Sequence, residues 1–209
     1  MESKKFTVNS DAERMAAARY ATEEFARSAK LGQRDTLRLT LLVEETLGMM
    51  KAMVDEFYGQ LWFAGEGNKC QLHLQATANV NADAKEELLS VSTTGKNAAA
   101  KGFMSMLGEV ISSAAHSFGK GLDAAYGQNA VQYGFVSPGG MGTPDVYDIT
   151  PIWSLQQYRT NLEANRGDAA DAALDDLEKS IVANLADDVV VGVKRDRIEM
   201  VIATTFKGA

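Results

Sequence analysis

The segment from Cys70 to Val80 constrains the fold most, because its side chains alternate between apolar and polar along its whole length. The apolar positions are Cys70, Leu72, Leu74, Ala76, Ala78 and Val80. Successive side chains of a β-strand point to opposite faces of the sheet, so this alternation predicts a strand with one buried face and one polar face. Such strands are typical of antiparallel sheets that are covered on one side only.

Further strands are predicted near both ends of the chain. The alternation of Lys5 to Val8 indicates one strand, and Gln60 to Ala64 indicates another. Val189 to Val193 and Ile198 to Phe206 flank a charged turn and read as a hairpin. Since helices separate these segments, we expect an α/β (α+β) two-layer sandwich. Its mixed, mostly antiparallel sheet would carry helices on one face.

Two helices are predicted in the first third of the chain, over Asp11 to Lys30 and over Asp35 to Tyr58. Ser10 and Glu13 have the spacing of a capping box for the first helix. The second helix carries apolar residues at 3.6-residue spacing and is expected to be well buried. Its predicted inward positions are Leu39, Leu42, Val43, Thr46, Met50, Met53, Val54 and Phe57.

Two more helices are predicted before the C-terminal hairpin. One runs from Thr150 to Asn165, with Pro151 at its first helical position. The other spans Ala169 to Ala186.

Composition and charge narrow the classes of function. The chain has 209 residues, 45% of them hydrophobic, which suits one folded domain. Its 28 acidic residues outnumber 21 basic ones, giving a net charge of −7, which disfavours nucleic-acid binding. No apolar run approaches the roughly 18 residues of a membrane span, and the first residues lack a signal-peptide pattern. We therefore expect a cytoplasmic protein that binds neither nucleic acid nor membranes.

The sequence LLVEETLGMM at 41–50 resembles the second helix of the GHKL (Bergerat-fold, histidine kinase-like) ATPases. That family includes the anti-sigma-factor serine kinases and the sensor histidine kinases, and its helix reads apolar-apolar-Val-x-Glu-x-x-x-Asn. The predicted order of elements is also similar, over roughly residues 5–80 and 170–206. The resemblance implies a single domain over 1–209, with 81–167 as an enlarged helical insertion in place of the family's lid.

The resemblance implies a nucleotide site that holds ATP or ADP. Glu45 matches the family's catalytic Glu, which lies near the attacking nucleophile. The Asn that ligates Mg²⁺ in the family corresponds here to Met49. A thioether is a soft ligand, whereas Mg²⁺ prefers hard oxygen ligands. We therefore expect the chemistry of Mg-ATP to be altered or lost, with no metal held by the family's ligand.

Two further segments are candidates for nucleotide contacts. The family's Asp-x-Gly-x-Gly signature should follow the long strand, where Asn79 and Asp83 could bind the base, although the segment has no glycine. Gly139, Gly140 and Gly142 lie in a loop whose backbone amides could approach a phosphate. A plain surface loop is the alternative interpretation of that segment.

Several other residues have a structural interpretation. His73, on the polar side of its strand, and His116 are expected to be surface or capping residues. Cys70 is expected to be a small buried hydrophobic residue. Glu44 and Glu45 point about 100° apart on a helix and cannot face one ligand together.

These observations favour a regulatory module with a histidine kinase-like ATPase fold that binds a nucleotide, a protein partner or a second copy of itself, in the manner of anti-sigma partner switching. One alternative is an active ATP-dependent serine kinase or ATPase whose Mg²⁺ is held by Asn79, Asp83 or Asn97. The other is an unrelated α/β structural or interaction protein.

Overall fold

The computed structural model describes residues 1–54, 56–78, 107, 153–194 and 197–207. Within them, six strands form one sheet in the order β1-β2-β3-β6-β5-β4, and each pair of neighbours is antiparallel. The strands are β1 (Phe6–Asn9), β2 (Phe57–Glu66), β3 (Lys69–Ala78), β4 (Trp153–Ser154), β5 (Asp188–Lys194) and β6 (Arg197–Thr205).

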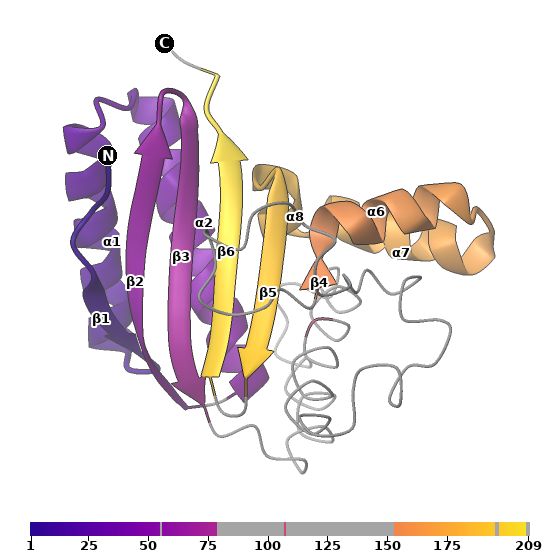
Figure 1. Cartoon of the computed structure of the whole chain (residues 1–209), viewed down its shortest axis with the longest axis horizontal. Helices are drawn as coiled ribbons and strands as arrows, with labels where there is room; N and C mark the ends of the chain where they lie inside the picture. The colour runs from indigo at the N-terminus through magenta and orange to yellow at the C-terminus, as the bar shows by residue number, and fades with distance from the viewer. Residues whose placement is uncertain (55, 79–106, 108–152, 195–196, 208–209) are drawn as a thin grey trace.

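Helices cover one face of this sheet, which confirms the predicted α+β two-layer class (Figure 1). Helices α1 (Ala12–Ser28) and α2 (Gln33–Val54) lie behind β1, β2, β3 and β6 in this view, and α8 (Ile181–Leu185) packs against α2. Helices α6 (Leu155–Ala164) and α7 (Asp168–Lys179) extend beyond the β4 edge. The expected insertion at 81–167 lies outside the described residues, except for Leu107 and 153–167.

The apolar residues of the long strand β3 lie in the hydrophobic core, as their predicted alternation requires. Leu72 and Leu74 of β3 are fully buried, and their partners across the ladders, Phe63 on β2 and Met200 on β6, are buried with them. The ring of Phe25 on α1 stacks on Phe63 with 4.8 Å between centroids, so α1 is anchored to the sheet through aromatic packing. Burial of such side chains stabilises the fold by about 1.5–3 kcal/mol each.

The boundary between α2 and β2 differs from the prediction. The helix ends at Val54, and Phe57 begins a strand instead of closing the helix. The backbone N–H of Phe57 donates to the Ser10 side-chain oxygen at 3.0 Å, so Ser10 holds the start of β2. The predicted capping box is therefore wrong: Asp11 is the N-cap of α1 and makes no side-chain capping bond.

The predicted C-terminal helices are shorter in the structure. The first begins at Leu155, because Trp153 and Ser154 pair with β5 and the Ser154 side chain caps the helix by accepting from the Gln157 N–H at 3.2 Å. Thr150 and Pro151 lie outside the described residues. The second divides into α7 and α8 at Ser180, which is extended and caps α8.

Gly59 permits the close pairing of β2 with β3. A Cβ at this position would lie 2.4 Å from the Gln75 carbonyl oxygen and 2.9 Å from the Ala76 Cα, both backbone atoms. We expect Gly59→Ala to lower the free energy of unfolding by about 1–3 kcal/mol, because the backbone must shift. Urea denaturation measures this change.

Gly65→Ala is the matched control on the same strand, since its Cβ would meet the end of the Phe25 ring at 3.4 Å. We expect a clearly smaller loss there. Equal losses in the two variants would contradict the steric explanation.

Candidate functional site

The surface of α2 that faces away from the sheet carries Glu45, one of the residues predicted to bind a nucleotide. Its inward residues are buried, among them Leu39, Leu42, Val43, Leu47 and Met50. The exposed or half-buried residues recur at the i, i+3, i+4, i+7 spacing of one helix side. We call them the outer stripe of α2: Arg34, Leu37, Arg38, Leu41, Glu44, Glu45 and Gly48.

Glu45 lies half-buried on the outer stripe. Burial raises the pKa of its carboxyl above the ordinary value, and the neighbouring negative charge of Glu44 raises it further. With its pKa raised, this carboxyl group takes up a proton at a higher pH than a fully exposed glutamate does.

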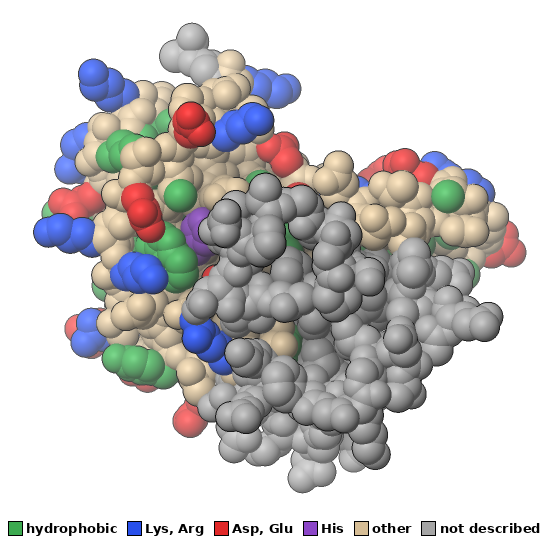
Figure 2. All heavy atoms as spheres, viewed as in Figure 1, with side chains coloured by type: hydrophobic (Ala, Val, Ile, Leu, Met, Phe, Trp, Pro, Cys, Tyr) green, Lys and Arg blue, Asp and Glu red, His purple; other side chains and the backbone are tan. Residues whose placement is uncertain are grey.

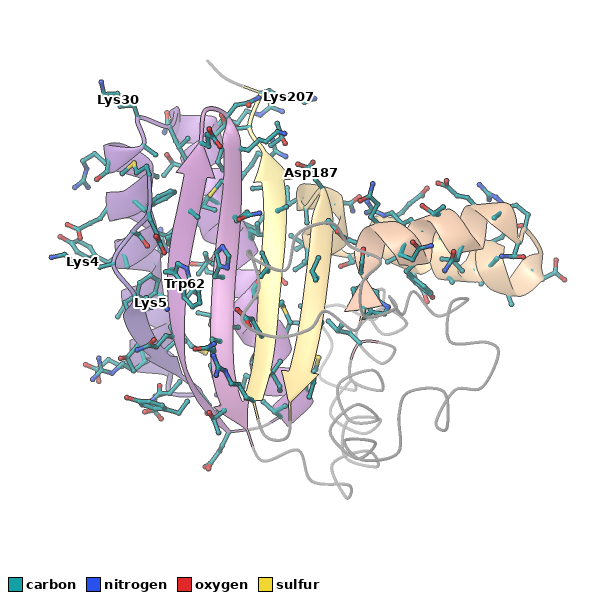
Figure 3. The ribbon with its side chains drawn as sticks, in the orientation of Figure 1. Lys4, Lys5, Lys30, Trp62, Asp187 and Lys207 are labelled. Carbon is teal, nitrogen blue, oxygen red and sulfur yellow. The ribbon has the colours of Figure 1, made fainter. Side chains whose placement is uncertain are left out.

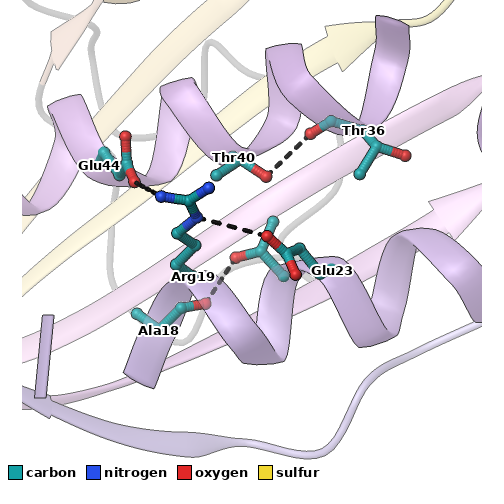
Figure 4. Close-up of polar contacts among 7 residues, drawn as sticks. Ala18, Arg19, Glu23, Thr36, Thr40 and Glu44 are labelled. Atoms are coloured by element: carbon teal, nitrogen blue, oxygen red, sulfur yellow. Dashed lines mark hydrogen bonds and ion pairs between the residues drawn. The ribbon is translucent and has the colours of Figure 1, made fainter. Parts of the chain in front are cut away.

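Glu44 is turned toward α1. Its carboxylate lies 3.9 Å from the Arg19 guanidinium, which also binds Glu23 at 3.3 Å (Figure 4). The side chains of all three residues are more than 40% exposed, so these ion pairs contribute little to stability. The ion pair with Arg19 holds the Glu44 carboxylate toward α1. It therefore points away from Glu45, as expected from the angle of about 100° between the two residues.

Met49 does not lie on the outer stripe. It is 4% exposed and belongs to the hydrophobic core. Its expected contact with a nucleotide stays a prediction. Its burial follows from helical geometry, since positions 42, 46, 49, 50 and 53 all face the sheet. Thr46 is also buried, and its hydroxyl donates to the Leu42 carbonyl at 2.6 Å.

Gly48 also lies on the outer stripe of α2. It is exposed, it lies one helical turn beyond Glu44 and Glu45, and a Cβ built there would meet nothing within 4 Å. A glycine inside a helix is destabilising by about 0.5–1 kcal/mol relative to alanine. That isolated glycine in an otherwise strongly helical sequence is the signal that could have identified the position.

The other predicted contacts cannot be placed beside Glu45. Asn79, Asp83, Asn97 and His116 lie outside the described residues, as do Gly139, Gly140 and Gly142. Among the residues that are described, no group of three His, Cys, Asp or Glu side chains could hold a metal ion. No helix in the same parts of the chain is long and apolar enough to cross a membrane.

A second group of residues lies on the face of the sheet opposite the helices, where charged and hydrophobic side chains gather over β1 to β3 (Figure 2). Ser3 hydrogen-bonds Phe63 and Phe6 pairs with Leu61, so Lys4 and Lys5 together oppose Trp62 in a β-bulge. The bulge directs Lys5 over Trp62, with Nζ 4.1 Å from the ring centroid, while Lys4 points away (Figure 3).

The His73 ring stacks on the Trp62 ring. Its ring lies 4.9 Å from that of Trp62 at an interplanar angle of 9°, and the residue is 7% exposed. The prediction of a surface histidine is therefore wrong, because neighbouring strands bury it. Burial lowers the pKa of His73, Lys5 lowers it further, and Glu2 opposes the shift.

Cys70 is buried as expected, at 3% exposure. Burial raises the pKa of its thiol to about 12, so the reactive thiolate is absent at neutral pH. Cys70 is therefore a packing residue.

No protein-family model, curated protein or solved structure matches this chain. The resemblance of the α2 sequence to the histidine kinase-like ATPases therefore stays a prediction. The residues of α2 carry the functional argument by themselves.

The lowered pKa of His73 predicts how stability depends on pH. The unfolded chain binds a proton near pH 6.5, whereas the folded chain binds it only at lower pH. Between these values the unfolded state binds more protons, so the free energy of unfolding falls as pH falls below about 6.5. Urea denaturation at several pH values should show a shallower dependence for His73→Gln than for the wild type, and parallel curves would contradict the prediction.

The open space around Gly48 predicts that Gly48→Ala stabilises the protein by about 0.5–1 kcal/mol, because alanine has the higher helix propensity. Urea denaturation checks this value. The matched control is Ala52→Gly, at an exposed position one turn later on α2, which should destabilise by a similar amount. A loss of stability in Gly48→Ala would mean that an added methyl group meets an obstacle.

Proposed function

We propose that this chain is a regulatory binding module with a histidine kinase-like ATPase fold, and that the outer stripe of α2 binds ATP or ADP without Mg²⁺. The observation that carries the proposal is the difference in exposure between two positions one turn apart on α2. Glu45 is half-buried on the outer stripe, whereas Met49, which stands where the family has its Mg²⁺ ligand, lies about 40° further around the helix and in the core.

The outer stripe offers the chemistry that a metal-free nucleotide needs. Phosphate groups without Mg²⁺ keep their full negative charge, and arginine side chains bind them with paired hydrogen bonds. Arg34 and Arg38 lie on the same side of α2 as Glu45, about three turns and about two turns before it. Gly48 leaves the helix backbone accessible to a flat ligand.

The arrangement of the sheet also supports the proposal. A strand and two helices precede the β2–β3 hairpin, and the β5–β6 hairpin completes the same sheet from the other end of the chain. That order of elements is the one expected from the resemblance. A module of this kind would sense nucleotide and respond in its affinity for a partner, with little or no hydrolysis.

A thermal-shift titration tests the proposal. We expect ATP and ADP to raise the midpoint of unfolding, because a ligand that binds only the native state stabilises it by about 2.7 kcal/mol at 100 times its dissociation constant. The shift should be equal with and without Mg²⁺, because the proposed site binds the nucleotide without a metal ion. Glu45→Ala should reduce the shift. The matched control is Glu66→Ala in the β2–β3 hairpin, which should leave it unchanged.

Two outcomes would contradict the proposal. The absence of any shift at millimolar nucleotide would remove nucleotide binding. A shift that requires Mg²⁺, together with ATP turnover, would favour the active kinase or ATPase instead.

A further inference from the structure

The outer stripe of α2 exposes apolar side chains that no described element covers. Leu37 is 61% exposed and Leu41 is 38% exposed, and both lie in the N-terminal half of α2. One turn after Glu44, the helix backbone is not covered by a side chain of its own, because the residue there is Gly48. Single exposed leucines are ordinary, but two on one helix side form a surface that a partner can bury.

The charges of the outer stripe change sign at Leu41. The two basic residues, Arg34 and Arg38, precede it by seven and three positions, and the two acidic residues, Glu44 and Glu45, follow it by three and four. When two stripes lie antiparallel, the basic half of each is therefore opposite the acidic half of the other.

We infer that the outer stripe binds the outer stripe of a second copy of this chain, with the two α2 helices antiparallel and a two-fold axis at Leu41. Such an axis places a residue that precedes Leu41 in one chain opposite a residue that follows it in the other, and every contact occurs twice. The two Leu41 side chains then meet at the centre.

The charged pairs follow from the same geometry. At 100° per residue, Arg38 and Glu45 lie roughly 60° and 40° from Leu41 around the helix, on the same side of it. The axis therefore brings Arg38 of each chain to Glu45 of the other. Arg34 lies opposite Gly48, seven positions to the other side of Leu41, where the missing side chain leaves room for it.

Contacts within the described part of the chain leave both Arg38 and Glu45 partly accessible. The Arg38 side chain is 26% exposed, and its guanidinium lies 3.9 Å from Asp35 of its own helix, a distance at which the ion pair is weak. Glu44 is drawn toward Arg19 on α1, so Glu45 is the acidic residue that faces the partner. A second copy fits this surface better than an unrelated protein, because one stripe supplies both signs of charge in reversible order.

The inference does not depend on nucleotide binding. The same stripe carries the proposed nucleotide site, so a bound nucleotide and a second copy would exclude each other. Tests of self-association are therefore made on the full chain without nucleotide, and their failure is distinct from the failure of the proposed function.

Sedimentation analysis of charge-reversal variants tests the inference. We expect the wild type to dimerise with concentration, and we expect Arg38→Glu and Glu45→Arg each to raise the dissociation constant by about tenfold or more, because each variant opposes like charges twice. An equimolar mixture of the two variants should form a mixed dimer, since both cross-chain pairs are then of opposite charge. A size tag on one variant identifies it.

The mixture also separates the interface from misfolding, because a misfolded variant is not restored by its partner. Leu41→Ser should weaken the dimer as well, while Tyr58→Ser, at an exposed residue on the opposite face of the sheet, should not. A wild type that stays monomeric overturns the inference. So does a dimer that both charge reversals leave intact, or a mixture that forms no mixed dimer.

Discussion

The antiparallel ladder between β3 and β6 is the interaction on which the rest of the structure depends. It joins residues 69–77 to residues 197–205, so it closes the N-terminal and C-terminal parts of the chain into one sheet. Because Leu72 pairs with Ile202 and Leu74 with Met200, the ladder aligns the apolar sides of both hairpins. A shift of one residue would turn every one of these side chains to the other face.

The helical layer follows from that aligned face. α2 covers it with a broad apolar side, which includes Met49, and this leaves only a narrow side for function. Glu45 and Met49 are one turn apart, and the boundary between the exposed side of α2 and the core runs between them. Leu41 and Gly48 lie on the exposed side, outside the core.

Much of the fold could be predicted from local pattern, and the errors have a common cause. The first helix and five of the six described strands could be predicted, because alternation and 3.6-residue spacing are local properties. β4 could not, because its two residues fall within a segment predicted as helix. Phe57 was expected in α2 because it fits the helical spacing, yet it is equally buried as the first residue of β2. The start of a strand at Phe57 is stabilised by Ser10, which is distant in the sequence and whose hydroxyl oxygen accepts the Phe57 N–H.

The sequence by itself determined the α+β class, the buried side of the long strand and the burial of Cys70, since each depends on neighbours within a few residues. Only the tertiary structure decided that His73 is buried against Trp62, that Lys5 covers that ring, and that the side of α2 with Gly48 is exposed. The physical reason is that these features depend on residues far away in the chain. Neighbouring strands determine which side chains are buried on the face of the sheet opposite the helices, and the packing of α2 on the sheet determines which side of the helix is exposed.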